Sequence, residues 1–256
     1  MELDGASVLV TGGASGIGEA SARRLSLLGA KPVICDLNEE KGEAIATALK
    51  GVFVKCDVTK TDQIQAAVDA ATALAPLRAV VNAAGIGNAS RTVNRQGEPF
   101  PLDQYEFVIK VNLIGTFDVL RLSAAAMSKQ EPVDSDGQRG AIVNIASVAA
   151  FDGQIGQAAY SSSKGGVVGM TLPVARDLSA LGIRLNCIAP GLIDTPIYGS
   201  GEGSDAFKAN LGQNVLFPKR LGDGSELASM VAECITNDYM NGETIRVDGG
   251  IRMPPK

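Results

Sequence analysis

The chain of 256 residues contains no histidine. This absence excludes catalysis by Ser-His-Asp or Cys-His groups, and it excludes every zinc site that uses imidazole, so we expect no metal site. The four cysteines are scattered along the chain without a Cys-x-x-Cys pair. That distribution is typical of core thiols in a reducing compartment.

Long apolar runs are also missing. No stretch approaches the roughly 18 consecutive apolar residues of a membrane span, and the acidic start Met1-Glu2-Leu3-Asp4 is unlike a signal peptide. A net charge of −5 argues against a surface that follows nucleic-acid phosphates. We therefore expect a cytoplasmic protein that binds neither nucleic acid nor membrane.

The chain is rich in glycine, with 30 residues, and long enough for one sizeable α/β domain. Short apolar runs alternate with segments of helical periodicity; the predicted strands are 7–11, 32–35, 51–56, 79–81, 141–145, 183–188 and 244–247. This alternation predicts a Rossmann-type, doubly wound parallel sheet of seven strands with helices on both faces. We predict a single domain over 1–256, with insertions near 86–101 and 129–139 and a substrate lid near 194–216.

A glycine cluster separates the first predicted strand from the helix that follows it. Gly12, Gly16 and Gly18 would allow a tight turn, close approach of the backbone to a pyrophosphate, and close packing of helix on strand. The N-terminus of that helix would offer free N–H groups to the anion. Because no Gly-Lys-Ser/Thr follows, a Walker A loop is excluded. The cluster predicts a dinucleotide site at the carboxyl ends of the strands.

Asp36 ends the second predicted strand, about twenty residues after the glycines. A carboxylate there would accept hydrogen bonds from the adenosine ribose and repel a 2′-phosphate. Leu37 follows it, and no lysine or arginine lies within the glycine turn, so NAD is favoured over NADP. The alternative is that Asp36 caps the helix that begins near Glu39.

Polar and small residues follow the next two strands. Asp57 stands where it could meet the adenine amino group, and the fourth strand ends in Asn82-Ala83-Ala84-Gly85, which would let a flat ring or a ribose lie against the backbone. Asn112 falls in the middle of one long predicted helix, 102–127. Its neighbours are apolar, which favours burial of its side chain.

Tyr160 and Lys164 are four residues apart and share one face of a predicted helix. A nearby cation stabilises a tyrosinate, so the pair could move protons; the alternative is a surface helix whose lysine is solvated. Ser147 lies just past the carboxyl end of the strand 141–145, a short loop before that helix. Ser147 and Tyr160 can therefore converge on one carbonyl or alcohol oxygen.

Taken together and in this order, the motifs resemble those of the classical short-chain dehydrogenase/reductases over essentially the whole chain. The resemblance rests on the segments 11–18 and 82–85, on Pro190-Gly191, and on Asn112, Ser147, Tyr160 and Lys164. Within the family, the segments 138–177, 220–223 and 251–253 are similar to the type 2 3-hydroxyacyl-CoA dehydrogenases, also known as type 10 17β-hydroxysteroid dehydrogenases. We expect no counterpart of the mitochondrial extension of the animal members, and 194–213 matches them poorly.

The resemblance implies an NAD-dependent oxidoreductase that interconverts 3-hydroxyacyl-CoA and 3-oxoacyl-CoA, and a homotetramer. It implies that Ser147 polarises the substrate oxygen and that Tyr160, as tyrosinate, takes the hydroxyl proton. Lys164 would lower the pKa of Tyr160 and hold the nicotinamide ribose, while Asn112 would anchor a water. Gln157 would touch the substrate, or it is an exposed helix start.

The same resemblance implies a set of cofactor contacts. They are Gly12, Ser15, Gly16, Ile17 and Gly18 at the pyrophosphate, Asp36 at the adenosine ribose, Asp57 and Val58 at the adenine, Asn82, Ala83 and Gly85 at the ribose side, Tyr160 and Lys164, and Pro190, Ile193 and Thr195 towards the carboxamide. Two alternatives remain open. The same groups would serve a secondary-alcohol or hydroxysteroid dehydrogenase, and an idle relative could act as a binding scaffold.

Overall fold

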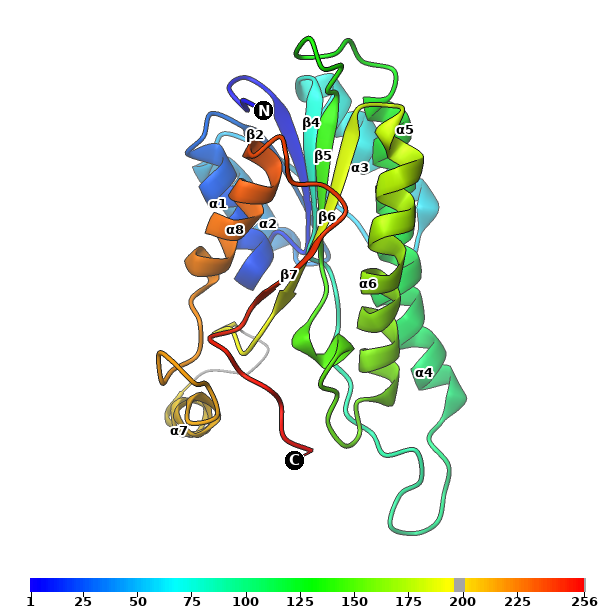
Figure 1. Ribbon diagram of the computed structural model, residues 1–256, viewed down its shortest axis with the longest axis vertical. Helices are drawn as coiled ribbons and strands as arrows, with labels where there is room; N and C mark the ends of the chain where they lie inside the picture. Colours follow the sequence, from blue (N-terminus) through cyan, green and yellow to red (C-terminus); the bar gives the residue numbers. More distant parts are fainter. Residues whose placement is uncertain (196–200, 256) are drawn as a thin grey trace.

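The computed structural model describes residues 1–195 and 201–255, and its sheet is seven-stranded and parallel throughout, in the order β3-β2-β1-β4-β5-β6-β7 (Figure 1). The strand order reverses beside β1, which creates the crevice where α/β sheets bind ligands. The predicted fold class is confirmed. The strands are β1 (Ser7–Thr11), β2 (Lys31–Asp36), β3 (Val52–Lys55), β4 (Leu77–Asn82), β5 (Gly140–Ile145), β6 (Ile183–Pro190) and β7 (Thr244–Val247).

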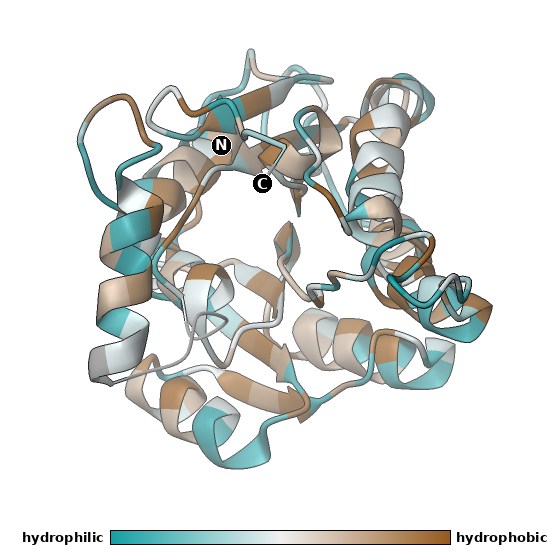
Figure 2. Cartoon of the chain, turned by 90° about the horizontal axis from the view of Figure 1, so that it is seen from below, coloured by the Kyte–Doolittle hydropathy of each residue, from teal (hydrophilic) through white to brown (hydrophobic). Residues whose placement is uncertain are grey.

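Helices cover both faces of the sheet (Figure 1). Alternate residues of β1 face opposite layers: Val8 and Val10 are buried with α1, α2 and α8, whereas Leu9 is buried with α3 and α5. Viewed along the strands, apolar residues mark the sheet, and hydrophilic ones lie on the outer helix faces and loops (Figure 2). The helices are α1 (Gly16–Ser26), α2 (Glu39–Ala48), α3 (Thr61–Leu74), α4 (Leu102–Ile109), α5 (Thr116–Met127), α6 (Ala158–Ser179), α7 (Glu202–Gly212) and α8 (Gly224–Thr236).

The long helix predicted over 102–127 contains a π-helical segment, η1 (Lys110–Gly115), between α4 and α5. The residues at both junctions keep right-handed helical dihedrals, so the chain runs through without a break. Such π-helical turns often occur at functional sites. Asn112 lies inside this one and is fully buried, as predicted.

The two insertions lie at opposite ends of the strands, which we call the carboxyl edge and the amino edge of the sheet (Figure 1). The segment 86–101 extends from the carboxyl edge as a loop closed by a bridge between Val93 and Pro99. The segment 129–139 folds at the amino edge, where Asp134 accepts hydrogen bonds from Gln138. Part of the predicted lid, 196–200, lies outside the described residues; α7 belongs to the rest, and Lys208 pairs with Asp194 at 2.8 Å.

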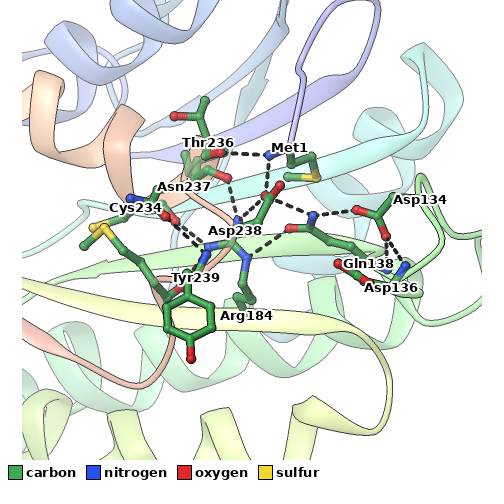
Figure 3. A network of polar contacts seen from close by, with 12 residues as sticks. Met1, Asp134, Asp136, Gln138, Arg184, Cys234, Thr236, Asn237, Asp238 and Tyr239 are labelled. Atoms are coloured by element: carbon green, nitrogen blue, oxygen red, sulfur yellow. Dashed lines mark hydrogen bonds and ion pairs between the residues drawn. The ribbon is translucent and has the colours of Figure 1, made fainter.

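A buried arginine ties the amino edge together (Figure 3). Arg184, near the start of β6, donates to the carbonyls of Cys234 and Ile235 at 2.7 and 2.6 Å, and to Gln138 Oε1 at 2.9 Å. Asp238 lies 3.7 Å from its guanidinium and also binds the Met1 amino group. These bonds hold the last turn of α8 against β6.

None of the described helices is long and apolar enough to cross a membrane. In the described residues, no three His, Cys, Asp or Glu side chains gather as metal ligands would.

Candidate active site

A cavity of about 830 Å³ opens at the carboxyl ends of the strands. Its volume is within the range of small-molecule and cofactor sites, and its place is the one at which doubly wound sheets bind ligands. The predicted residues that line it are Gly12, Ser15, Gly16, Ile17, Gly18, Asp36, Asp57, Val58, Ala83, Gly85, Ser147, Gln157, Tyr160, Lys164, Pro190, Ile193 and Thr195. Residues from every part of the chain therefore meet in one cavity.

The glycine turn brings the backbone of β1 and the start of α1 to the cavity wall. A Cβ on Gly18 would lie 2.1 Å from the Gly12 carbonyl oxygen, so glycine is needed for this close packing of helix on strand. Ser15 is the N-cap of α1, and its hydroxyl makes no capping bond to the helix. The first turn of α1 therefore has no side-chain cap, and its first residues, Gly16 and Ile17, line the cavity, as an anion site at a helix N-terminus requires.

Asp36 connects the end of β2 to the glycine turn. Its Oδ2 accepts a hydrogen bond from the Ala14 N–H, and its Oδ1 accepts one from the Asn38 N–H, each at 3.0 Å. The cap of α2 is Asn38, which accepts from the Lys41 N–H, so the capping alternative for Asp36 is wrong. The carboxylate stays at the cavity wall, where the sequence placed it.

Asn82 is the one predicted cofactor contact that does not line the cavity. It is paired in register with Asn144 on β5, and its Nδ2 donates to Asn144 Oδ1 at 2.8 Å. This pairing keeps the Asn82 amide bonded to the neighbouring strand, and Asn82 is only 2 % exposed. The small residues after it, Ala83 and Gly85, do reach the cavity.

Ser147 and Tyr160 converge as predicted, and their hydroxyls are hydrogen-bonded. Burial raises the pKa of Tyr160, and the bond from Ser147 opposes that rise. Burial also lowers the pKa of Lys164 to about 8. The Lys164 Nζ lies 5.9 Å from the Tyr160 ring centroid and donates to the Ile145 carbonyl at 2.9 Å.

Lys164 was expected to lower the pKa of Tyr160, but the causes of the shift in the protein without cofactor are burial and the bond from Ser147. Removal of the phenol from water dominates the shift, and it favours the neutral form. At neutral pH Tyr160 is therefore a phenol that can donate a proton.

Asn112 stands behind this pair rather than in the cavity wall. Its Nδ2 donates to the Ile86 carbonyl at 2.9 Å and to Ser163 Oγ at 3.1 Å, and its Oδ1 accepts from the Ile86 N–H at 2.8 Å. The Ser163 hydroxyl in turn donates to the Tyr160 carbonyl at 2.7 Å. Asn112 thus joins the loop after β4 to the turn of α6 that carries Tyr160 and Lys164.

Comparison with known proteins assigns the family. The family model described as short chain dehydrogenase matches residues 6–202. The chain belongs to the short-chain dehydrogenase family. It is therefore an oxidoreductase, and its family implies a nicotinamide cofactor.

Individual members of the short-chain dehydrogenase family are similar over nearly the full length. The chain is 50% identical over 258 residues to the human 3-hydroxyacyl-CoA dehydrogenase type-2, covering 99% of this chain and 97% of that protein. The ipsdienol dehydrogenase of Ips pini is 34% identical, covering 95% and 96%. A crystal structure of 3-hydroxyacyl-CoA dehydrogenase type-2 from Mycobacterium avium superposes with a TM-score of 0.94 at 45% identity, covering 100% of this chain and 99% of that chain.

The cavity of this short-chain dehydrogenase fits a nicotinamide dinucleotide. A Cβ on Gly85 would lie 3.4 Å from Lys164 Nζ, so the glycine leaves open the space beside the ammonium. Asp36 lines the cavity beside the glycine turn, and Lys164 lines it beyond Gly85. The residues present thus offer a carboxylate for a ribose, N–H groups for a pyrophosphate, and an ammonium near the reacting end.

Several cavity residues were not predicted. Gln157 was predicted, and it lines the cavity as the half-buried N-cap of α6, with its Oε1 accepting from the Gln154 N–H at 2.9 Å. It is therefore not the exposed helix start of the alternative. Phe107, Val148 and Met253 line the cavity as well, and no site role was predicted for these apolar residues. Ser163, which bonds Asn112 behind the cavity wall, was also not predicted, although it directly precedes Lys164 in the sequence.

Proposed function

We propose that this short-chain dehydrogenase catalyses the NAD-dependent interconversion of 3-hydroxyacyl-CoA and 3-oxoacyl-CoA. The observation that carries the proposal is the 50% identity, along 99% of the chain, to a relative that bears this activity in its name. The convergence of Ser147, Tyr160 and Lys164 in one cavity supports the chemistry.

Ser147 and Tyr160 can hold the substrate oxygen between two hydroxyl groups. When bound, the nicotinamide ring supplies or accepts the hydride at the substrate carbon. Reduction also requires a proton on the oxygen, and the raised pKa of Tyr160 keeps the phenol protonated for that transfer. Oxidation runs the same transfer backwards, from the substrate hydroxyl to the tyrosinate oxygen.

Lys164 supports the proton transfer from its place beside the tyrosine. With a pKa of about 8, its ammonium is largely charged at neutral pH but close to the range in which it can release a proton. Asn112 fixes the backbone around the pair through Ser163 and Ile86. The predicted water at Asn112 would then link Lys164 to solvent, and it remains a prediction.

We propose NAD as the cofactor because the carboxylate of Asp36 occupies the end of β2. Both its oxygens accept backbone N–H bonds, from Ala14 and Asn38, which fixes the carboxylate in place. A fixed negative charge there repels the 2′-phosphate of NADP and can bind a ribose hydroxyl.

We also propose a homotetramer in the cytoplasm. Gly165 and Gly169 on α6 face open space, and Phe107, Ile114 and Phe117 on the α4–α5 side are 55%, 57% and 45% exposed. Apolar exposure along neighbouring helices is typical of subunit contacts. Light scattering behind a sizing column should give four chain masses, and a monomer mass would contradict the proposal.

The activity is tested by following NADH oxidation with acetoacetyl-CoA, a steroid ketone and a simple ketone in parallel. We expect the thioester to be reduced fastest, with Tyr160→Phe as the inactive control. If the steroid or the simple ketone is preferred, the function is that of a hydroxysteroid or secondary-alcohol dehydrogenase, an alternative that the ipsdienol dehydrogenase relative favours. If no ketone is reduced although NADH binds, the scaffold alternative replaces both.

A further inference from the structure

The C-terminal segment 251–255 lies along the loop that joins Ser147 to Tyr160. The Ile155 N–H donates to the Pro255 carbonyl, and Gln154 Nε2 donates to the Pro254 carbonyl, each at 3.0 Å. Asp152 accepts a hydrogen bond from the Met253 N–H. The tail is therefore bonded at three places to the loop 151–157, on the carboxyl side of the sheet (Figure 1).

Arg246, on β7, fixes the start of this tail. Its Nη2 lies 2.6 Å from Asp152 Oδ2, and its Nε lies 2.7 Å from Asp248 Oδ2. Nη2 also donates to the Ile251 carbonyl at 2.9 Å, and the guanidinium lies 5.4 Å from the Phe151 ring centroid. One arginine thus connects the last strand, the tail and the loop after Ser147.

This ion-pair cluster is largely shielded from water. The side chains of Arg246 and Asp152 are 21% and 18% exposed, and that of Asp248 is 9% exposed. Charge-assisted bonds of this length in a shielded place fix geometry far better than exposed pairs do. The path of the tail is therefore set by the fold of the loop 151–157.

The consequence reaches the cavity through Met253. Met253 lines the same cavity as Gln157 and Tyr160. Gln157 ends the loop to which the tail is bonded, and its Oε1 accepts from the Gln154 N–H in that loop. Because the Met253 N–H is bonded to Asp152, in the loop between Ser147 and Tyr160, we infer that Met253 lies at the substrate end of the cavity and not at the Asp36 end. A thioether is unbranched and flexible, so it suits a pocket wall that must accommodate alkyl chains.

We propose that the tail 251–255 forms a wall of the acyl pocket, that Met253 sets the preference for acyl-chain length, and that Arg246 is the residue that positions it. The proposal rests on the proposed function, because it assumes an acyl thioester as substrate. It assigns a role in substrate specificity to the tail, which belongs neither to the glycine turn nor to the groups that transfer the proton.

The test compares kcat/KM for acetoacetyl-CoA with that for 3-oxodecanoyl-CoA. One to several methylenes of extra room in an apolar pocket change such a ratio by about tenfold or more. We expect Met253→Ala to shift the ratio about tenfold towards the longer chain and Met253→Phe to shift it towards the shorter one. Met230→Ala, the same truncation on α8 against the core, serves as the matched control and should leave the ratio unchanged. An unchanged ratio in both Met253 variants would overturn the proposal.

The role of Arg246 is tested by separating KM from kcat. Arg246→Met should raise KM for the thioester several-fold, leave the Kd of NADH unchanged, and shift the chain-length ratio in the direction of Met253→Ala. Arg246→Lys, which keeps the charge near Asp152, should recover part of the loss. If Arg246→Met does not fold, Asp152→Asn weakens the same link and gives the same readout. A fall in kcat with an unaltered ratio would show a merely structural role and refute the positioning.

Failure of this proposal is distinguishable from failure of the proposed function. If the wild-type enzyme reduces neither thioester, the proposed function is wrong and the acyl pocket with it. The Met253 variants are then compared on a small and a bulky ketone that the wild type does reduce. If the wild type reduces both thioesters and the variants keep its ratio, the function stands and the tail assignment falls.

Discussion

Replacing Lys164 by methionine should stabilise the protein at neutral pH while it abolishes turnover. The side chain is buried, and burial lowers its pKa from the ordinary 10.5 to about 8. At about 1.4 kcal/mol per pKa unit, the charged form costs the folded state about 3 kcal/mol. Methionine removes that cost, but it also loses the hydrogen bond from Lys164 to the Ile145 carbonyl, which offsets about 1–2 kcal/mol of the gain. The net gain is about 1–2 kcal/mol, or a Tm higher by about 2–8 °C for a domain of this size.

The gain should depend on pH in a definite direction. The folded-state pKa lies below the unfolded one, so the unfolded chain binds more protons between about pH 8 and pH 10.5. Wild-type stability therefore rises with pH through that window, whereas the methionine variant lacks this rise. Its advantage is greatest below pH 8 and shrinks by about 2 kcal/mol by pH 9.5.

Urea denaturation without cofactor, at pH 7 and at pH 9.5, measures both effects. Lys129→Met, which removes an exposed lysine, is the control and should change neither value by more than about 0.5 kcal/mol. A Lys164→Met variant that is less stable than wild type at pH 7, by the same amount as at pH 9.5, would refute the reasoning. The ammonium would then be held in the fold without electrostatic cost.

Four further predictions concern the site and the fold. Tyr160→Phe should lower kcat by about 10²-fold or more with little change in NADH binding, because it removes the proton donor; near-normal turnover would sink the assignment. Asp36→Ala should reduce the preference for NADH over NADPH by about tenfold or more, and an unchanged ratio would place the discrimination elsewhere. Deleting residues 98–101 should raise KM more than it lowers kcat if this insertion touches substrate, and equal losses in both would argue against contact. Arg184→Met should lower the free energy of unfolding by about 3 kcal/mol, because it leaves the buried carbonyls of α8 without a donor. The measured Tm should fall by about 6–12 °C, and a smaller fall would mean that water replaces the guanidinium.

The sequence predicted the parts of the fold that repeat a local pattern. Each strand was found from an apolar run and the glycine turn from its spacing, because local geometry alone decides both. The π-helical turn around Asn112 was not predictable, since a single extra residue in a helix leaves the apolar pattern nearly unchanged. The sequence left open whether Asp36 faces the cofactor or caps the helix that begins near Glu39, and in the structure Asn38 is the N-cap of α2.

Contacts between distant segments were the least predictable. Asn82 was expected at the cofactor, but the register of β4 against β5 pairs it with Asn144. Met253 belongs to a segment that carries the family resemblance, but nothing in that segment indicates that it lines the cavity. The tail is held there with the help of the Arg246–Asp152 ion pair, whose partners are 94 residues apart. Such placements follow from sheet register and from where a chain end packs, which no short stretch of sequence contains.

Each end of the strands holds a buried cation, and the two cations differ in the partners around them. At the amino edge, Arg184 donates to backbone carbonyls and to Gln138, and Asp238 supplies an opposite charge. Burial still lowers the pKa of Arg184, and the Asp238 carboxylate offsets part of that shift. At the carboxyl edge, Lys164 donates to the Ile145 carbonyl and, among the described residues, forms no ion pair with a carboxylate. Its pKa therefore falls, and ammonium donors remain for a bound ligand. The fold thus gives several carbonyl acceptors and a carboxylate to the cation that holds helix and strand together, and a single carbonyl acceptor to the cation beside Tyr160.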